Sequence, residues 1–483
     1  MPPGVVGKKW RRPSRFDRNL IVIGAGSAGL VAAYLAASLR ARVTLIEAAR
    51  MGGDCLNTGC VPSKALIHAA RGGENHAQAM ARVRAAIAAI APHDSVERYE
   101  ALGVEVRHGA ARLLDPWHVA IAGETLSARA IVIAAGAAPL IPPIPGLAEA
   151  PYVTSETLWD LEDLPKRLVI LGGGPIGCEL AEAFARLGAA VSLVELADRV
   201  LNREDEEVSA LLSSALARRG VAILTGHRAL AVRRQGGDFT LGVVGKDGGR
   251  VLPFDRLLVA VGRQPRVTGY GLEEIGVALG AAGTIATDPW LRTNFRHILA
   301  CGDVAGPWQF THMAGYQGGY AALNALFGGL WRLRPDTRAV PAVTFTTPEI
   351  ARVGLNEREA RARGIGCEVT RYAFADLDRA IIEDETEGFV KILTPPGKDR
   401  ILGATIVGTA AGELISEITL AMRHGLGLKK LLATIHPYPT RSEALRAAAG
   451  LWRKNHAAPG LLALLARFHA GRRGAGYFVP KAW

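Results

Sequence analysis

Two cysteines stand close together early in the chain, in the segment of residues 52–64. Four residues separate Cys55 from Cys60. In a regular helix, positions five apart differ by about 7.5 Å along the axis, more than the roughly 7 Å between Cα atoms that a disulfide bridges. We therefore predict a bent backbone, permitted by Gly59, and a redox-active disulfide. Two buried thiols or half of a metal site are the alternatives, but no second close pair accompanies this one, so we predict no metal.

The number of cysteines favours a pair that cycles between disulfide and dithiol. Five cysteines in 483 residues do not make a secreted disulfide scaffold, and no apolar signal-peptide core follows Met1. We expect a reducing, cytoplasmic compartment, where a lasting structural disulfide is unusual. The other cysteines are expected to be small buried hydrophobic residues: Cys178, Cys301 and Cys367.

The net charge of +12 is concentrated at the two ends of the chain. Residues 1–18 and 456–483 are basic and contain aromatic residues, but no nucleic-acid-binding motif accompanies them, so we expect no nucleic-acid partner. These tails could contact anionic lipid peripherally, with solvated tails as the alternative. Residues 461–468 are an apolar helix candidate for a membrane surface or for packing on the protein itself.

Residues 21–39 carry no charge, but their glycines favour a strand, a turn and a helix over a membrane span.

A glycine-rich turn follows the first apolar strand. Gly24, Gly26 and Gly29 have the spacing G-x-G-x-x-G, a helical run follows them, and the next strand ends at Glu47. In this order the glycines let the backbone approach a pyrophosphate at a helix N-terminus, and the acid binds a ribose hydroxyl. The pattern predicts a dinucleotide-binding fold.

The same unit recurs later in the chain. Gly172, Gly174 and Gly177 follow another apolar strand, and Glu195 ends the next one; 23 positions separate the first glycine from the acid in both copies. Two dinucleotides are therefore expected. A carboxylate suits an unphosphorylated ribose and repels a 2′-phosphate, so NADH is favoured over NADPH, although the basic Arg199 is close in sequence.

The rest of the chain alternates between strand-like and helical runs. Residues 104–122 predict strands, and the prolines within residues 139–145 mark a crossing between domains. From about Pro341, strands surround helices without a new glycine turn. The predicted fold class is α/β, with two Rossmann-like dinucleotide-binding domains and a C-terminal α+β domain.

Taken in order, these motifs resemble the two-cysteine pyridine nucleotide–disulfide oxidoreductases, the family of mercuric reductase, dihydrolipoamide dehydrogenase and glutathione reductase. The resemblance covers about residues 19–455. It rests on the cysteine segment, the two glycine units and four further motifs, at residues 134–136, 261–265, 300–303 and 345–351. It implies a homodimer in which residues 19–150 and 282–338 bind FAD, residues 151–281 bind NAD(P)H and residues 339–455 form the dimerisation domain, with basic tails at residues 1–18 and 456–483.

Carried over by position, the resemblance implies two sets of cofactor contacts. The expected FAD contacts are Gly24, Gly26, Gly29, Glu47, Gly53, Asp54, Lys64, Ala111, Gly136, Asp303 and Thr311. The expected NAD contacts are Gly172, Gly174, Gly177, Glu179, Glu195 and Gly262. Lys64 is implied to pair with Glu179 beside the flavin, where the ion pair polarises the ring or is only structural. Hydride is implied to pass from NADH to the flavin and electrons on to Cys60, with Cys55 facing the acceptor.

The chain departs from the family pattern near its C-terminus. Disulfide-reducing relatives carry a histidine before Pro-Thr that serves the partner subunit as acid and base, and Tyr438 stands in its place. A free tyrosine titrates at about 10 and a histidine at about 6.5, so tyrosine is the poorer proton shuttle. His436 would lie on the same side of an extended segment and could supply the base, oriented by Glu443, or it could be structural.

A second departure precedes the first cysteine. Asp54 stands where relatives usually have threonine, and a neighbouring carboxylate should raise the pKa of the Cys55 thiol. A tyrosine at position 438 resembles the pattern of mercuric reductase. Unlike in that family, no cysteine pair for metal delivery follows Cys367. We predict an enzyme that passes hydride from NAD(P)H through FAD and the cysteine pair to a small acceptor, either a metal ion or a disulfide such as lipoamide. The alternative is a membrane-associated electron-relay or redox-sensing subunit.

Overall fold

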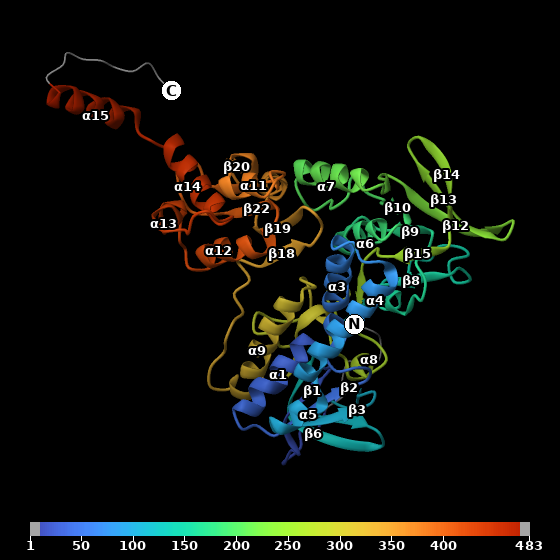
Figure 1. The fold of residues 1–483 in the computed structure, drawn as a ribbon. Coiled ribbons are helices and arrows are strands. Elements are labelled where there is room, and N and C mark those ends of the chain that lie inside the picture. The colour runs from blue at the N-terminus through green and yellow to red at the C-terminus, as the bar shows by residue number, and fades with distance from the viewer. Residues whose placement is uncertain (1–9, 474–483) are drawn as a thin grey trace. The chain divides into compact units, whose positions relative to one another are not determined.

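The computed structural model describes residues 10–473, and within this range the chain forms two compact units. Unit 1 comprises residues 10–202 and 209–336, and unit 2 comprises residues 203–208 and 337–473 (Figure 1). The outer parts of both basic tails, residues 1–9 and 474–483, lie outside the described residues. The domain boundaries predicted within unit 1 remain predictions.

In unit 1, the first glycine turn and its strands belong to a mixed sheet with the strand order β3-β2-β1-β6-β5-β4. In this sheet β17 also pairs with β6. Its strands are β1 (Arg18–Ile23), β2 (Val43–Glu47), β3 (Val104–His108), β4 (Arg112–Leu113), β5 (His118–Ile121), β6 (Glu124–Ile133) and β17 (Ile298–Ala300). The central strands run parallel. Strands buried on both faces are continuous apolar runs, and Leu20, Val22 and Leu45 accordingly have no exposed surface.

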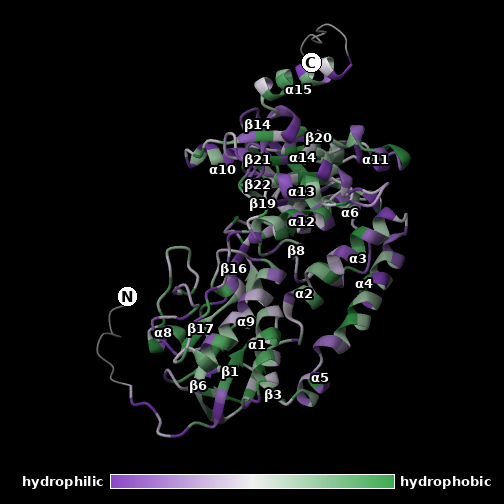
Figure 2. Cartoon of the chain, turned by 90° about the vertical axis from the view of Figure 1, so that its left-hand side faces the viewer, coloured by the Kyte–Doolittle hydropathy of each residue, from purple (hydrophilic) through white to green (hydrophobic). Residues whose placement is uncertain are grey.

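Helices pack on this sheet: α1 (Ser27–Ser38), α5 (Val96–Ala101), α8 (Leu272–Ile275) and α9 (Thr311–Phe327). The cysteine segment and the helix after it form α2 (Gly53–Asn57), α3 (Cys60–Arg71) and α4 (His76–Ile90). Helices α1 and α9 pack side by side (Figure 1), and Figure 2 shows the apolar run from β1 into α1 in green. The uncharged residues 21–39 are therefore a strand, a turn and a helix, as expected.

The second glycine unit lies in an all-parallel sheet with the order β11-β10-β9-β15-β8. Its elements are β8 (Tyr152–Thr154), β9 (Arg167–Leu171), α6 (Pro175–Arg186), β10 (Ala190–Val194), α7 (Glu206–Arg218), β11 (Ala222–Leu224) and β15 (Arg256–Val259). Two smaller sheets accompany it, which the sequence analysis missed. They are β12 (Arg228–Gln235), β13 (Asp238–Gly245) and β14 (Gly248–Phe254), and the pair of β7 (Ala137–Pro139) with β16 (Arg263–Pro265).

Unit 2 is the expected α+β domain, built on an antiparallel sheet with the order β18-β19-β22-β21-β20. Its strands are β18 (Pro341–Thr344), β19 (Glu349–Gly354), β20 (Glu368–Ala373), β21 (Phe389–Thr394) and β22 (Gly403–Gly408). Its helices are α10 (Glu357–Ala362), α11 (Asp378–Ile382), α12 (Ala411–Arg423), α13 (Leu428–Ala433), α14 (Glu443–Asn455) and α15 (Pro459–Arg472). The core packs α12, α13 and α14 on this sheet.

Helix α15 contains the apolar run predicted at residues 461–468. Its apolar side chains are largely exposed: Leu461, Leu462, Leu464, Leu465 and Phe468. Across residues 10–473, the helices are too short or too polar to span a bilayer.

Candidate active site

The cysteine segment bends where the sequence predicted it. Helix α2 ends at Asn57 and α3 begins at Cys60, so Thr58 and Gly59 form the bend. A Cβ atom on Gly59 would lie 2.9 Å from the carbonyl oxygen of Asp54. The close approach of the backbone therefore requires glycine at this position. The φ of −116° does not require it, because other residues adopt that angle.

The two thiols of this segment have opposite acidities. Cys55 and Cys60 are free thiols, and a hydrogen bond between them is the largest influence on both. This hydrogen bond lowers the pKa of Cys60 to about 5. The hydroxyl of Thr311, 3.3 Å from the Cys60 Sγ, and the charge of Lys64 make smaller contributions in the same direction. The same bond and burial raise the pKa of Cys55. Cys60 is thus a thiolate near neutral pH, held by the protonated Cys55.

Asp54 acts differently from the prediction. Its carboxylate forms an ion pair with Arg263, which also donates to the carbonyl of Ala137 at 2.8 Å and lies 3.7 Å from Asp303. The pKa of Cys55 is raised as expected, but Cys60 and burial cause this. The prediction was wrong about the cause because the carboxylate is directed at a cation.

Lys64 and Glu179 meet across 115 positions of sequence, as the resemblance implied. The Lys64 Nζ on α3 lies 2.8 Å from a carboxylate oxygen of Glu179 on α6. Glu179 is buried, with 5% of its surface exposed. This ion pair connects the cysteine helix to the helix that follows the second glycine turn.

The first glycine turn is held by close contacts and by Glu47. Gly24 has a φ of +103°, and a Cβ there would lie 2.4 Å from the carbonyl oxygen of Ala134. A Cβ on Gly29 would lie 1.8 Å from the carbonyl of Gly24. The Glu47 carboxylate accepts hydrogen bonds from the backbone N–H groups of Ala25 at 2.6 Å and Ala49 at 2.7 Å. At Gly26, the residue before α1, no side chain caps the helix amides.

The second turn repeats this construction. Gly172 has a φ of +105° and its Cβ would lie 2.4 Å from the carbonyl oxygen of Ala260. A Cβ on Gly177 would lie 1.8 Å from the carbonyl of Gly172. Glu195 accepts from Gly173 at 2.5 Å and from Ala197 at 2.7 Å. Gly174 precedes α6 without a side-chain cap and has open space where a Cβ would stand. Both turns therefore fit a nucleotide pyrophosphate.

The other predicted cofactor contacts lie around these turns. Gly53 packs on Gly26, where a Cβ would come within 2.6 Å of the Gly26 Cα. Gly136 and Gly262 have positive φ angles and open surroundings, and Ala111 is buried in the core under the sheet. Burial raises the pKa of Asp303. Near the second turn, Arg199 forms an ion pair with Asp198.

The three C-terminal candidates are in unit 2 and have separate partners. The His436 side chain is 4% exposed, and its Nε2 lies 2.9 Å from a carboxylate oxygen of Glu417. Tyr438 is exposed and donates a hydrogen bond of 2.9 Å to Asp378, which raises the pKa of the tyrosine.

Glu443 does not orient His436, so that prediction was wrong. Its carboxylate instead accepts from the backbone N–H of Thr440 at 3.3 Å. Glu443 is the first residue of α14, where an acidic side chain is favoured by the helix dipole. Glu417 on α12, which the sequence analysis did not single out, takes the place beside the histidine.

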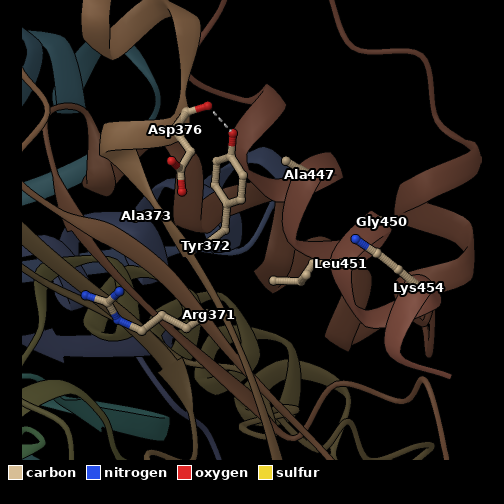
Figure 3. A pocket seen from close by; sticks show the side chains of 8 residues that line it. All are labelled: Arg371, Tyr372, Ala373, Asp376, Ala447, Gly450, Leu451 and Lys454. Carbon is tan, nitrogen blue, oxygen red and sulfur yellow. Dashed lines mark hydrogen bonds between the residues drawn. The ribbon is translucent and has the colours of Figure 1, made fainter. Parts of the chain in front are cut away.

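Unit 2 also contains a surface hollow between β20 and α14, with a volume of about 520 Å³. Figure 3 shows its lining, in which the Tyr372 hydroxyl donates to the carbonyl oxygen of Asp376. It contains none of the predicted site residues. This hollow is therefore separate from the candidate active site.

Two nucleotide turns, a polarised dithiol and a lysine paired with a buried glutamate define a nucleotide-dependent oxidoreductase that works through a cysteine pair. Residues 18–318 match the family described as pyridine nucleotide-disulphide oxidoreductase, and residues 340–449 match the dimerisation domain of that family. The chain belongs to the pyridine nucleotide–disulphide oxidoreductases. These are FAD- and NAD(P)H-dependent enzymes that act on sulfur groups or metal ions.

The named relatives of the chain have several different activities. A mercuric reductase of Staphylococcus aureus is 32% identical over 450 residues, covering 90% of this chain and 82% of the relative. A dihydrolipoyl dehydrogenase of Thermus scotoductus is 37% identical over 457 residues, covering 89% and 96%. Among solved structures, the Cu(II) complex of the HOCl-induced flavoprotein disulfide reductase RclA of Escherichia coli is similar, with a TM-score of 0.82, 30% identity and coverage of 90% and 99%.

Proposed function

We propose that this enzyme uses NADH to reduce a thiophilic metal ion bound by Cys55 and Cys60. When bound, the flavin supplies the two-electron centre between the nicotinamide and the dithiol. The observation that carries the choice of acceptor is the pair of Tyr438 and Asp378, with His436 buried against Glu417. The printed names of two relatives, a mercuric reductase and a Cu(II) complex, point the same way.

The two kinds of acceptor differ in their need for protons. Reducing a disulfide substrate releases thiols whose formation requires a proton donor near neutral pH. A tyrosine whose pKa is raised by Asp378 is a weaker proton donor, and the His436 side chain is 4% exposed and bonded to Glu417. A thiolate-bound metal ion takes up electrons without protonation. The C-terminal residues therefore suit a metal ion better than lipoamide or glutathione disulfide.

The electrons balance for this acceptor. Cys55 and Cys60 bind the metal as thiolates and lose two electrons when the disulfide forms. One bound Hg(II) becomes Hg(0), or two Cu(II) become two Cu(I). NADH returns two electrons to the cysteine pair and leaves as NAD⁺, so each NADH reduces one Hg(II) or two Cu(II).

The test is an NADH-oxidation screen on the flavin-loaded enzyme with Hg(II), Cu(II), lipoamide and glutathione disulfide. We expect turnover with a metal ion that is abolished in Cys60→Ser, and disulfide turnover at least tenfold slower. Tyr438→His should raise lipoamide turnover. Fast lipoamide reduction by the unmodified enzyme, with no metal-dependent oxidation, would overturn the proposal.

We further propose that NADH is preferred to NADPH and that the enzyme acts as a homodimer. Glu195 holds the second turn through two backbone N–H groups, and its charge opposes a 2′-phosphate. The match to the family's dimerisation domain supports the homodimer. Sedimentation should give twice the mass of 51.1 kDa, and a monomer would exclude it.

A second candidate function is peripheral attachment to anionic lipid on the cytoplasmic side. It is favoured by the exposed leucines of α15 and by the absence of any Asp or Glu after Glu443 in the sequence. The chain and a version cut after residue 457 are compared for co-sedimentation with vesicles containing 30% phosphatidylserine. Equal binding of the two would remove this candidate.

A further inference from the structure

The cysteine segment is held at both ends of α2 by two side chains that lie far from it in sequence. We propose that Trp159 and Arg263 are positioning residues that fix this segment to the edge of the second nucleotide-binding sheet and thereby set the dithiol–disulfide equilibrium of Cys55 and Cys60. The proposal does not depend on which acceptor the enzyme reduces.

Trp159 holds the bend between the two cysteines. It lies in a 3₁₀ turn, Leu158–Asp160, shortly after β8. Its indole N–H is 2.9 Å from the carbonyl oxygen of Thr58 and 2.8 Å from that of Ser155. Thr58 directly follows α2 and is the first residue of the bend. The indole thus anchors the bend to its own turn, 101 positions along the chain.

Arg263 holds the other end of α2. Asp54, in the first turn of that helix, forms an ion pair with the guanidinium. The same guanidinium donates to the carbonyl of Ala137 on β7 and is near Asp303. A planar guanidinium can direct several N–H groups at fixed angles, so Asp54 is tied to two separate parts of unit 1.

Both anchors come from one edge of one sheet. Strands β8 and β15 are hydrogen-bonded neighbours and run parallel, so the chain leaves both at the same side. Trp159 follows β8 and Arg263 follows β15. The second glycine turn is at this edge too, because Gly172 packs against the carbonyl of Ala260, directly after β15. The cysteine segment of the first fold is therefore docked beside the nucleotide turn of the second.

Movement of this segment would change the thiols directly. The bend of Thr58 and Gly59 joins the helix that bears Cys55 to the helix that begins with Cys60. The bond between the two thiols governs the acidity of both and exists only in the dithiol. Loosening the bend weakens this bond in the dithiol and so favours the disulfide.

The test uses flavin-loaded Trp159→Phe, which keeps an aromatic ring and removes the N–H donor. The enzyme is equilibrated in glutathione redox buffers, quenched with an alkylating agent and scored by mass spectrometry. We expect the equilibrium to move about tenfold toward the disulfide, equivalent to about 30 mV for two electrons, with the NADH KM within twofold of the unmodified enzyme.

Trp117→Phe is the matched control. Trp117 stacks on His297 in the first fold, and we expect no change of equilibrium. Arg263→Lys keeps the charge but not the geometry of the guanidinium and should give a shift in the same direction. An equilibrium within twofold of the unmodified enzyme in Trp159→Phe, or in Arg263→Lys if the tryptophan variant does not fold, would overturn the proposal. A lower Tm without a shift would show a purely structural role.

Discussion

The two glycine units are nearly identical in construction and differ in what covers them. Gly24 and Gly172 have φ angles of +103° and +105°, and each would place a Cβ 2.4 Å from a strand carbonyl. Glu47 and Glu195 each accept two backbone hydrogen bonds of 2.5 to 2.7 Å. The sequence spacing therefore produced the same local geometry twice.

The difference lies at the middle glycine of each turn. Gly53 of the cysteine segment packs on Gly26, whereas nothing lies within 4 Å of a Cβ on Gly174. The first turn is covered by the protein's own chain, and the second is open. This difference suits a flavin that stays bound and a nicotinamide that enters and leaves in each catalytic cycle.

The largest expected effect comes from filling the covered turn. In Gly53→Ala, the new Cβ would come within 2.6 Å of the Gly26 Cα at a φ of +58°, which costs about 1–3 kcal/mol for the conformation alone. We expect loss of most bound flavin and a lower Tm, measured by absorbance and by calorimetry.

Gly174→Ala is its counterpart in the open turn. It should retain flavin and Tm and raise the NADH KM about tenfold, or about 1.4 kcal/mol. If both variants lost flavin equally, the contrast between a covered and an open turn would fail.

The next prediction distinguishes the roles of Glu195 and Glu47. Glu195→Gln keeps an acceptor for the turn but removes the charge that opposes a 2′-phosphate. We expect the ratio of kcat/KM for NADH to that for NADPH to fall about tenfold in steady-state assays. Glu47→Gln, the matched change beside the first glycine turn, should leave this ratio unchanged and weaken flavin retention.

The Lys64–Glu179 pair joins α3, which begins with Cys60, to α6, which follows the second glycine turn. Lys64→Met removes the positive charge that helps to lower the pKa of Cys60 from its usual range to about 5. The pKa should rise, so less thiolate is present between pH 5 and 7. We expect the alkylation rate of Cys60 at pH 6 to fall about fivefold in the reduced enzyme, measured by mass spectrometry. An unchanged pH profile would mean that the charge acts only on folding.

A second effect on the pKa of Cys60 comes from the hydroxyl of Thr311 beside it. Thr311→Val removes the hydrogen bond to the sulfur, which also helps to lower the pKa of Cys60. A depressed pKa means that thiolate is lost only as the pH falls through about 5, so this variant should lose it at a somewhat higher pH. We expect alkylation at pH 6 to slow about fivefold, with Thr347→Val in unit 2 as a control that leaves the rate unchanged.

Much of the fold followed from local patterns. Apolar runs ending in glycine predicted β1 and β9, the bend at Gly59 followed from the helical rise, and the change of pattern from about Pro341 predicted the α+β fold of unit 2. The candidate cofactor turns were found because glycine spacing reports a backbone geometry that other residues cannot adopt. The sheet β12-β13-β14 was missed because its residues mix charged and apolar side chains without a clear boundary.

The sequence alone determined the two nucleotide turns, the bent cysteine pair and the class of chemistry, since each depends on residues within about 25 positions of one another. Only the tertiary structure decided which distant groups tune them. Arg263 reaches Asp54 across 209 positions, Trp159 reaches Thr58 across 101, and Glu417 replaces Glu443 beside His436. Such contacts depend on how strands and helices pack, and side-chain partners at that separation leave no periodic signal in a single sequence.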